Sequence, residues 1–190
     1  MKCDSMKSDF PLHTAECAPE ASRALLVQVQ QKFGMTPNLF RVMATSPAML
    51  QAYLATSEAF TNSSLTPVEQ QVVLISTSVS NGCTYCVAAH SVIAEMTGVP
   101  AEVTNAMRDS TVIADTKLEA LRKFTQHLVD KRGYVECETT RANFYAAGYN
   151  SQSLLDVITG IGLKTMSNYM NHIAATPLDE AFQRLSGKNN

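Results

Sequence analysis

The stretch that decides the reading of this 190-residue chain is Asn81-Gly82-Cys83-Thr84-Tyr85-Cys86-Val87-Ala88-Ala89-His90. Asn81-Gly82 interrupts one predicted helix, and the next is expected to begin at about Cys83. With about 100° between successive residues, Cys83, Cys86 and His90 fall at about 0°, 300° and 340° and share one narrow helix face. Tyr85 falls at about 200° and points away. Two thiols beside an imidazole are typical of redox or metal chemistry.

The position of the two thiols indicates how they are activated. Cys83 is expected in the first helical turn, where unpaired N–H groups and the helix dipole favour a thiolate. His90 follows Cys86 by four residues, so its imidazole can take the thiol proton or, as imidazolium, hold the thiolate. A Cys-x-x-Cys pair at a helix start also suits a disulfide, with Cα atoms about 5–6 Å apart. These residues indicate one attacking and one resolving thiol, without deciding which is which.

A metal site and an inert pair are the alternatives to redox chemistry. A structural zinc site needs four ligands and usually a second Cys/His pair at short spacing. The remaining histidines form no such pair, so we expect no metal: His13, His127 and His172. The other three cysteines have no partner motif and are interpreted as incidental: Cys3, Cys17 and Cys137.

The composition limits the classes of function. The chain is 45% hydrophobic and 17% charged, which suffices for a substantial core and for buried subunit surface. The net charge is −2 with no Lys/Arg cluster, so nucleic acid is not an expected partner. No apolar run approaches the ~20 residues of a membrane span, and the segment before Pro19 lacks the apolar core of a secretory signal. We therefore expect a cytoplasmic protein, and no cofactor motif is present.

The chain is predicted to be all-α, with a flexible arm over residues 1–17 and a single helical domain over residues 18–190. Thr66-Pro67-Val68-Glu69 is a strong helix start, because Thr66 can cap, Pro67 suits the first turn and Glu69 completes a capping box. The helix that follows contains a β-branched run. The other expected helices cover Glu20–Lys32, Leu39–Ala44, a segment begun by Ser46-Pro47, Cys83–Met96, Pro100–Arg108, a segment capped by Asp115 and ended by Gly133, Glu138–Ala147 and Leu178–Leu185.

The longest helix is expected to be capped by Ser151 or Ser153 and to run to about Ala175. It contains Gly160 and Gly162, and a glycine inside a helix costs about 1 kcal/mol relative to alanine. These two glycines therefore indicate close helix packing, within or between subunits.

The segments Leu65–Glu69 and Asn81–His90 resemble the core of the carboxymuconolactone decarboxylase family, in its alkylhydroperoxidase D-like branch. Phe33–Phe40 and Asn168–Asp179 are also similar to members of this group. The resemblance implies a helical bundle with the Cys-x-x-Cys at the N-terminus of a core helix, assembled as a homo-oligomer of three or six subunits. It implies an antioxidant enzyme that reduces small hydroperoxides and is recycled by a thioredoxin-like or dithiol electron donor.

The resemblance also implies roles for individual residues. Cys86 would attack the peroxide and become a sulfenic acid, Cys83 would condense with it to a disulfide, and His90 would relay the proton. Gln71 stands where the family carries a relay glutamate, and a carboxamide can hold His90 but cannot shuttle a proton. Tyr85 stands where some relatives have a histidine. Glu69 is near Gln71 in sequence, but its capping role already explains it.

These departures keep two alternatives open. One is a slow dithiol redox sensor or disulfide oxidoreductase module without peroxidase turnover, and the other is a metal-binding protein. His172, with Asn168 and Asn171 at neighbouring helical spacings, is interpreted as part of a polar patch at a helix crossing rather than of the site.

Overall fold

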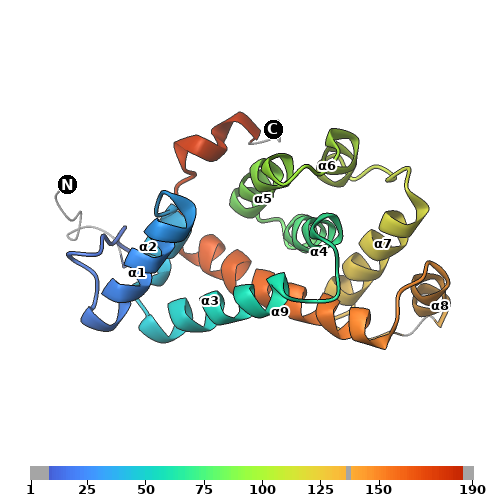
Figure 1. Cartoon of the computed structure of the whole chain (residues 1–190), viewed down its shortest axis with the longest axis horizontal. Coiled ribbons are helices and arrows are strands. Elements are labelled where there is room, and N and C mark those ends of the chain that lie inside the picture. The colour runs from blue at the N-terminus through green and yellow to red at the C-terminus, as the bar shows by residue number, and fades with distance from the viewer. Residues whose placement is uncertain (1–8, 136–137, 186–190) are drawn as a thin grey trace.

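The computed structural model describes residues 9–135 and 138–185, and within these ranges the chain is all-α without a strand, as predicted (Figure 1). None of the helices in these ranges combines the length and the apolar character needed to cross a membrane. The elements in chain order are α1 (Glu20–Phe33), α2 (Asn38–Met43), α3 (Pro47–Thr61), α4 (Pro67–Ser80), α5 (Thr84–Met96), α6 (Ala101–Arg108), α7 (Thr116–Asp130), α8 (Glu138–Ala146), α9 (Ser151–Ala174) and the 3₁₀ helix η1 (Glu180–Leu185).

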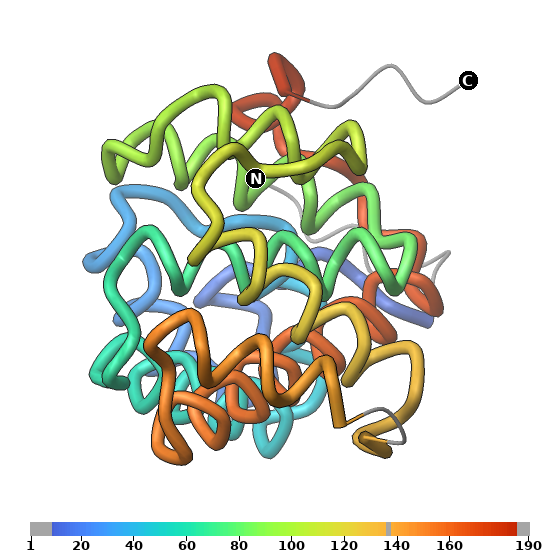
Figure 2. The backbone as a smooth tube through the Cα atoms, turned by 90° about the vertical axis from the view of Figure 1, so that its right-hand side faces the viewer, coloured from blue at the N-terminus to red at the C-terminus, as the bar shows by residue number. Residues whose placement is uncertain are grey.

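Helix α4 lies at the centre of the molecule. Figure 1 shows it end-on, with α5, α7 and α9 packed around it. Its β-branched run is buried, and Val72, Val73 and Ile75 are fully inaccessible. This composition therefore reflects burial on all sides of a helix rather than a strand. Figure 2 shows α3 and α9 on one side of the molecule and α5 and α6 on the opposite side.

Most of the predicted helix starts are confirmed. The Ser46 side chain accepts a hydrogen bond from Met49 N, and Thr66 and Glu69 form the complete capping box. The predicted cap of α9 is wrong, since Asn150 rather than Ser151 or Ser153 caps it. The Asn150 backbone is extended, which lets its Oδ1 accept a hydrogen bond from Ser153 N at 3.0 Å.

The two glycines of α9 differ in their surroundings. A Cβ atom added to Gly160 would lie 2.7 Å from atoms of Phe60 on α3 and Val73 on α4, whereas one added to Gly162 would meet nothing within 4 Å. Gly160 therefore provides close packing inside the chain, between α9 and the two helices beside it. This approach brings α9 alongside α4 and fixes its position relative to α5.

The two ends of the described chain are fastened to α2. Arg41 on α2 donates from Nε to His13 O and from Nη2 to Leu12 O, both at 3.1 Å, so this part of the predicted arm lies against the helices. Residues 1–8 lie outside the described ranges, and the division into arm and domain stays a prediction. At the other end, the helix expected at Leu178–Leu185 is the 3₁₀ helix η1, which packs against α5.

Candidate active site

The two motif cysteines lie at the start of α5. Cys83 is the N-cap residue, with extended backbone angles, and its own N–H donates to Ser78 O at 2.9 Å. The helix thus begins at Thr84, one residue later than predicted, and Cys86 lies in its first turn. Both cysteine side chains are buried, each 1% exposed, and both are free thiols.

Helix α9 contributes a buried polar stripe that faces these sulfurs. The stripe comprises four residues at helical spacing, all at most 5% exposed: Lys164, Ser167, Asn168 and Asn171. Asn171 Nδ2 lies 3.2 Å from Cys86 Sγ and 3.9 Å from Cys83 Sγ, as a donor to both. Ser167 Oγ lies 3.8 Å from Cys86 Sγ.

Asn168 ties the stripe to the end of α4. Its Oδ1 accepts a hydrogen bond from Asn81 Nδ2 at 2.9 Å, and its Nδ2 donates to Ser78 Oγ at 3.4 Å. Asn81 precedes the glycine of the motif, and Ser78 O receives the Cys83 N–H. The turn that presents Cys83 is therefore positioned from α9 as well as by its own sequence.

Buried charge makes the two thiols unequal. A hydrogen bond from Cys83 and the ammonium charge of Lys164 hold the pKa of Cys86 well below its ordinary value, against the opposing effect of burial. The same hydrogen bond, with burial, raises the pKa of Cys83. Burial lowers the pKa of Lys164, but the charges of Cys86 and Tyr53 outweigh it and the pKa is raised overall. These pKa directions favour a Cys86 thiolate beside a lysine cation and a neutral Cys83 thiol.

His90 is held by Gln71, and its surroundings favour the neutral ring. Its Nδ1 lies 3.1 Å from Gln71 Oε1. Burial and the charge of Lys164 hold the pKa of His90 well below its ordinary value. A neutral ring that donates from Nδ1 to a carboxamide oxygen has its Nε2 lone pair available to accept a proton. Among the described residues, no hydrogen bond joins this ring to Cys83 or Cys86, so an imidazolium does not hold the thiolate.

Glu69 lies in a separate network on the other side of α4. It completes the capping box at Thr66 N (2.8 Å), pairs with Lys117 Nζ (2.9 Å) and accepts from Tyr149 Oη (2.9 Å). Burial raises the pKa of Glu69, but these partners outweigh it and the pKa is lowered overall. These partners are structural, and the carboxylate fastens α4 to α7 and to Tyr149.

Tyr85 points away from the cysteines, as the helical angle predicts. Its hydroxyl donates to Asp179 Oδ2 at 2.5 Å and accepts from Leu39 N at 3.2 Å. The same carboxylate accepts from Asn38 N at 3.0 Å, and the Tyr85 ring packs edge-on against Phe182. Tyr85 therefore fastens α5 to the start of α2 and to the C-terminal segment.

Other predicted candidates lie apart from the sulfurs. His172 is exposed, although Asn168 and Asn171 beside it are buried against α4 and α5. Cys17 is disulfide-bonded, so the prediction that it is incidental is wrong. Cys3 and Cys137 lie outside the described residues. Within the described ranges, no three His, Cys, Asp or Glu side chains are gathered as a metal site would require.

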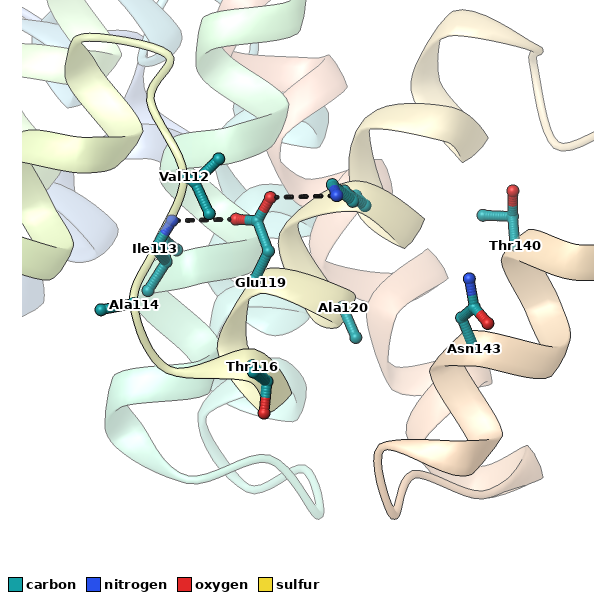
Figure 3. A pocket seen from close by; sticks show the side chains of 9 residues that line it. Val112, Ile113, Ala114, Thr116, Glu119, Ala120, Thr140 and Asn143 are labelled. Carbon is teal, nitrogen blue, oxygen red and sulfur yellow. Dashed lines mark hydrogen bonds and ion pairs between the residues drawn. The ribbon is translucent and has the colours of Figure 1, made fainter.

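A hollow of about 320 Å³ lies between α7, α8 and the segment before α7 (Figure 3). None of its lining residues belongs to the cysteine motif or to the polar stripe of α9. Glu119 accepts hydrogen bonds here from Ile113 N at 3.0 Å and from Arg122 Nε at 2.7 Å. Its carboxylate is occupied in fastening the segment before α7, which is a structural role.

The chain is similar to a known protein family and to solved structures. Residues 47–126 match the model of the carboxymuconolactone decarboxylase family. A peroxidase-related protein with an alkylhydroperoxidase AhpD core, from Ralstonia eutropha JMP134, superimposes with a TM-score of 0.81 at 22% identity, over 94% of this chain and 96% of that one. No curated protein matches the sequence.

Two further solved structures share the fold. A peroxidase-related protein from Silicibacter sp. TM1040 has a TM-score of 0.79 at 19% identity, over 98% of this chain and 99% of that one. The debrominase Bmp8, in complex with 2,3,4-tribromopyrrole, has a TM-score of 0.78 at 17% identity, over 96% of this chain and 97% of that one. At these identities the likeness establishes the fold, and the chemistry has to be argued from the site.

Proposed function

We propose that this chain, whose residues 47–126 match the carboxymuconolactone decarboxylase family and whose fold is alkylhydroperoxidase D-like, is a dithiol oxidoreductase that reduces hydroperoxides. The observation that carries the proposal is the unequal pair of buried thiols. Cys86 is paired with the buried Lys164 cation, and Cys83 is a neutral thiol beside it. A thiolate is the form of cysteine that attacks peroxides.

In the first step the Cys86 thiolate attacks the terminal oxygen of the hydroperoxide. The S–O bond forms as the O–O bond breaks, so the sulfur is oxidised by two electrons to a sulfenic acid and the peroxide is reduced. The alkoxide that leaves takes a proton from solvent, which His90 relays: the neutral ring first accepts this proton at Nε2 and then passes it on. Gln71 holds the imidazole for this step but cannot itself exchange a proton.

In the second step Cys83 resolves the sulfenic acid. Its sulfur attacks Cys86, the S–S bond forms, and the hydroxyl leaves with the Cys83 proton as water. A neutral thiol suits this role, because it does not compete with Cys86 for the peroxide. A dithiol or thioredoxin-like donor then returns two electrons and two protons and regenerates both thiols.

An apolar face on α9 supports the expected homo-oligomer of three or six subunits. Four large side chains are exposed on one side of this helix, with 49–73% of each accessible: Leu155, Ile158, Tyr169 and Ile173. Contiguous exposed apolar surface of this kind is typical of protein interfaces. The stripe that faces the sulfurs lies on another face of the same helix, so assembly would leave the polar stripe in place.

A slow redox sensor is the second candidate function, because both sulfurs are buried. Each motif cysteine is only 1% exposed, so a peroxide reaches Cys86 only when the surrounding side chains move. A sensor would be oxidised once and would persist as the disulfide. The two functions therefore differ in turnover and not in the bond that forms.

The test measures hydroperoxide consumption in excess dithiothreitol by the purified protein, by Cys86→Ser and by His172→Ala. His172 is exposed on α9 and serves as the control. We expect many equivalents consumed by the wild type and the control, none by Cys86→Ser, and a Cys83–Cys86 disulfide in the oxidised protein. Oxidation of one equivalent without turnover favours the sensor, and full activity in Cys86→Ser contradicts the assigned roles. Since one protein of this fold is a debrominase, a bromopyrrole is a required comparison substrate.

A further inference from the structure

The side-chain amide of Asn171 is only half used. Its Nδ2 donates to the sulfurs of Cys86 and Cys83, at 3.2 and 3.9 Å. Its Oδ1 is buried and has no hydrogen-bond partner. The residue is 5% exposed, so bulk water does not take the place of a partner. A buried acceptor without a partner is rare in folded proteins, and here it belongs to an amide that touches the reactive sulfur.

The other polar side chains of the stripe are already engaged. Ser167 donates to the carbonyl oxygen of Lys164 at 3.1 Å, and Asn168 is bonded to Ser78 and Asn81. Lys164 has only donors to offer. Asn171 Oδ1 is therefore the acceptor of this stripe that remains open, and a bound molecule with an O–H or N–H group would satisfy it.

We propose that Asn171 is a substrate-binding residue whose Oδ1 accepts the hydrogen bond of the terminal hydroxyl of a hydroperoxide, while its Nδ2 holds the Cys86 sulfur. The inference rests on the proposed peroxide reduction and adds the group that orients the substrate. A hydroperoxide carries its single hydrogen on the oxygen that the sulfur attacks. One planar amide thus contacts both atoms of the S–O bond that forms.

The same hydrogen bond is kept through the step. Before attack, the hydrogen belongs to the terminal peroxide oxygen. As the S–O bond forms and the O–O bond breaks, that oxygen and its hydrogen become the hydroxyl of the Cys86 sulfenic acid, and the alkoxide takes a solvent proton that His90 relays. Oδ1 accepts from the same hydroxyl in both states, so the amide orients the peroxide and then holds the sulfenic acid for Cys83.

The experiment compares two reagents of similar size at Cys86, in a Cys83→Ser background so that the first adduct persists. tert-Butyl hydroperoxide offers an O–H donor, and methyl methanethiosulfonate offers none. Both must pass the same covering side chains, so the ratio of their rate constants removes the effect of access. Quenched samples are read by mass spectrometry as the gain of one oxygen or of one methylthio group.

The variants are Asn171→Leu and Asn171→Ala, with His172→Leu as the exposed neighbour on the same helix. Loss of the Nδ2 donor slows both reagents through the thiolate. Loss of Oδ1 slows the peroxide alone, so we expect the rate ratio of peroxide to thiosulfonate to fall about tenfold in both Asn171 variants, the effect of about one hydrogen bond. The ratio should be unchanged in His172→Leu.

The outcomes separate this inference from the proposed function. Equal slowing of both reagents in the two Asn171 variants overturns the substrate-binding role alone, because the amide then acts only on the sulfur. A wild-type Cys86 that reacts with the thiosulfonate but with no hydroperoxide overturns the proposed function and this inference together. The alanine variant keeps the test decisive if leucine disturbs the helix, which circular dichroism reports.

Discussion

The start of α5 and the middle of α9 contribute to the same site in opposite ways. The first presents its sulfurs and imidazole within eight residues, Cys83 to His90, where their spacing alone indicates the chemistry. The second presents the stripe from Lys164 to Asn171, which begins outside the segments that resemble the family and whose role is evident only where it meets the sulfurs. The family match covers residues 47–126, so it includes the first region and stops before the second.

The reacting atoms and their electrostatic environment therefore come from separate parts of the chain, α5 and α9. The motif led us to expect activation by the helix start and by His90. In the structure His90 is neutral and bonded to Gln71, and the cation beside Cys86 is Lys164. Burying a lysine cation without an opposite charge would cost free energy of folding. The Cys86 thiolate and the Lys164 cation therefore stabilise the ionised state of each other.

We expect the largest effect from removing the charge of Lys164 on α9. In Lys164→Met we expect the pKa of Cys86 to rise, because burial then acts without an opposing cation. The thiolate fraction at neutral pH, and with it the rate of peroxide reduction, should fall about a hundredfold, the middle of the range for loss of a nearby charge. Ultraviolet thiolate absorbance against pH measures the shift directly.

The lowered pKa of Cys86 also predicts how stability and activity depend on pH. Because the pKa of Cys86 is lowered in the folded protein, its contribution to stability is present above the ordinary thiol pKa of 9.0 and is lost as the pH falls through the lowered value. Wild-type activity should persist well below pH 9.0, and Lys164→Arg, which keeps the charge, should retain most of it. An unchanged thiolate titration in Lys164→Met would contradict the role of Lys164.

A smaller effect on peroxide turnover is expected from placing a glutamate at Gln71, beside His90 of α5. In Gln71→Glu a carboxylate faces His90, where it can accept a proton and raise the pKa of the imidazole. We expect about a tenfold gain in peroxide turnover, below the usual range for general acid–base catalysis because Gln71 is buried. Gln71→Leu, which cannot hold the ring, should lose activity instead. Steady-state kinetics of the three proteins decide between these outcomes.

The smallest effect on chemistry is expected at Tyr85, which belongs to the motif but faces away from the sulfurs. Tyr85→Phe removes the hydrogen bond to the buried Asp179 carboxylate and leaves Leu39 N without its acceptor. We expect a loss of about 2 kcal/mol in the free energy of unfolding, measured by urea denaturation, with less than about a threefold change in peroxide rate. A larger loss of rate than of stability would place Tyr85 in the reaction.

Local features of the sequence could be predicted because their causes are local. The capping box at Thr66 and the cap at Ser46 depend on residues a few positions apart, and both are found in the structure. The cap of α9 was assigned wrongly because Ser151 and Ser153 lie within three positions of Asn150, and both asparagine and serine are good caps.

The polar stripe of α9 could not be found in this way. Lys164 lies 78 positions after Cys86 in the chain, and nothing near it in sequence says that it is buried. The spacing did contain a signal of this stripe, since Lys164, Ser167 and Asn171 lie on one face of the predicted helix. Only the close approach at Gly160 and the packing of α9 beside α4 turn that face toward the sulfurs.

The Asp179 junction has a practical consequence for anyone who handles this protein. Its carboxylate joins the start of α2 to Tyr85, the residue directly before Cys86, and η1 follows it at once along the chain. A purification tag or fusion partner attached at the carboxyl end therefore lies close along the chain to a contact that positions the helix with the reactive sulfur. Rates measured on carboxyl-terminal fusions are therefore to be compared with those of the untagged protein.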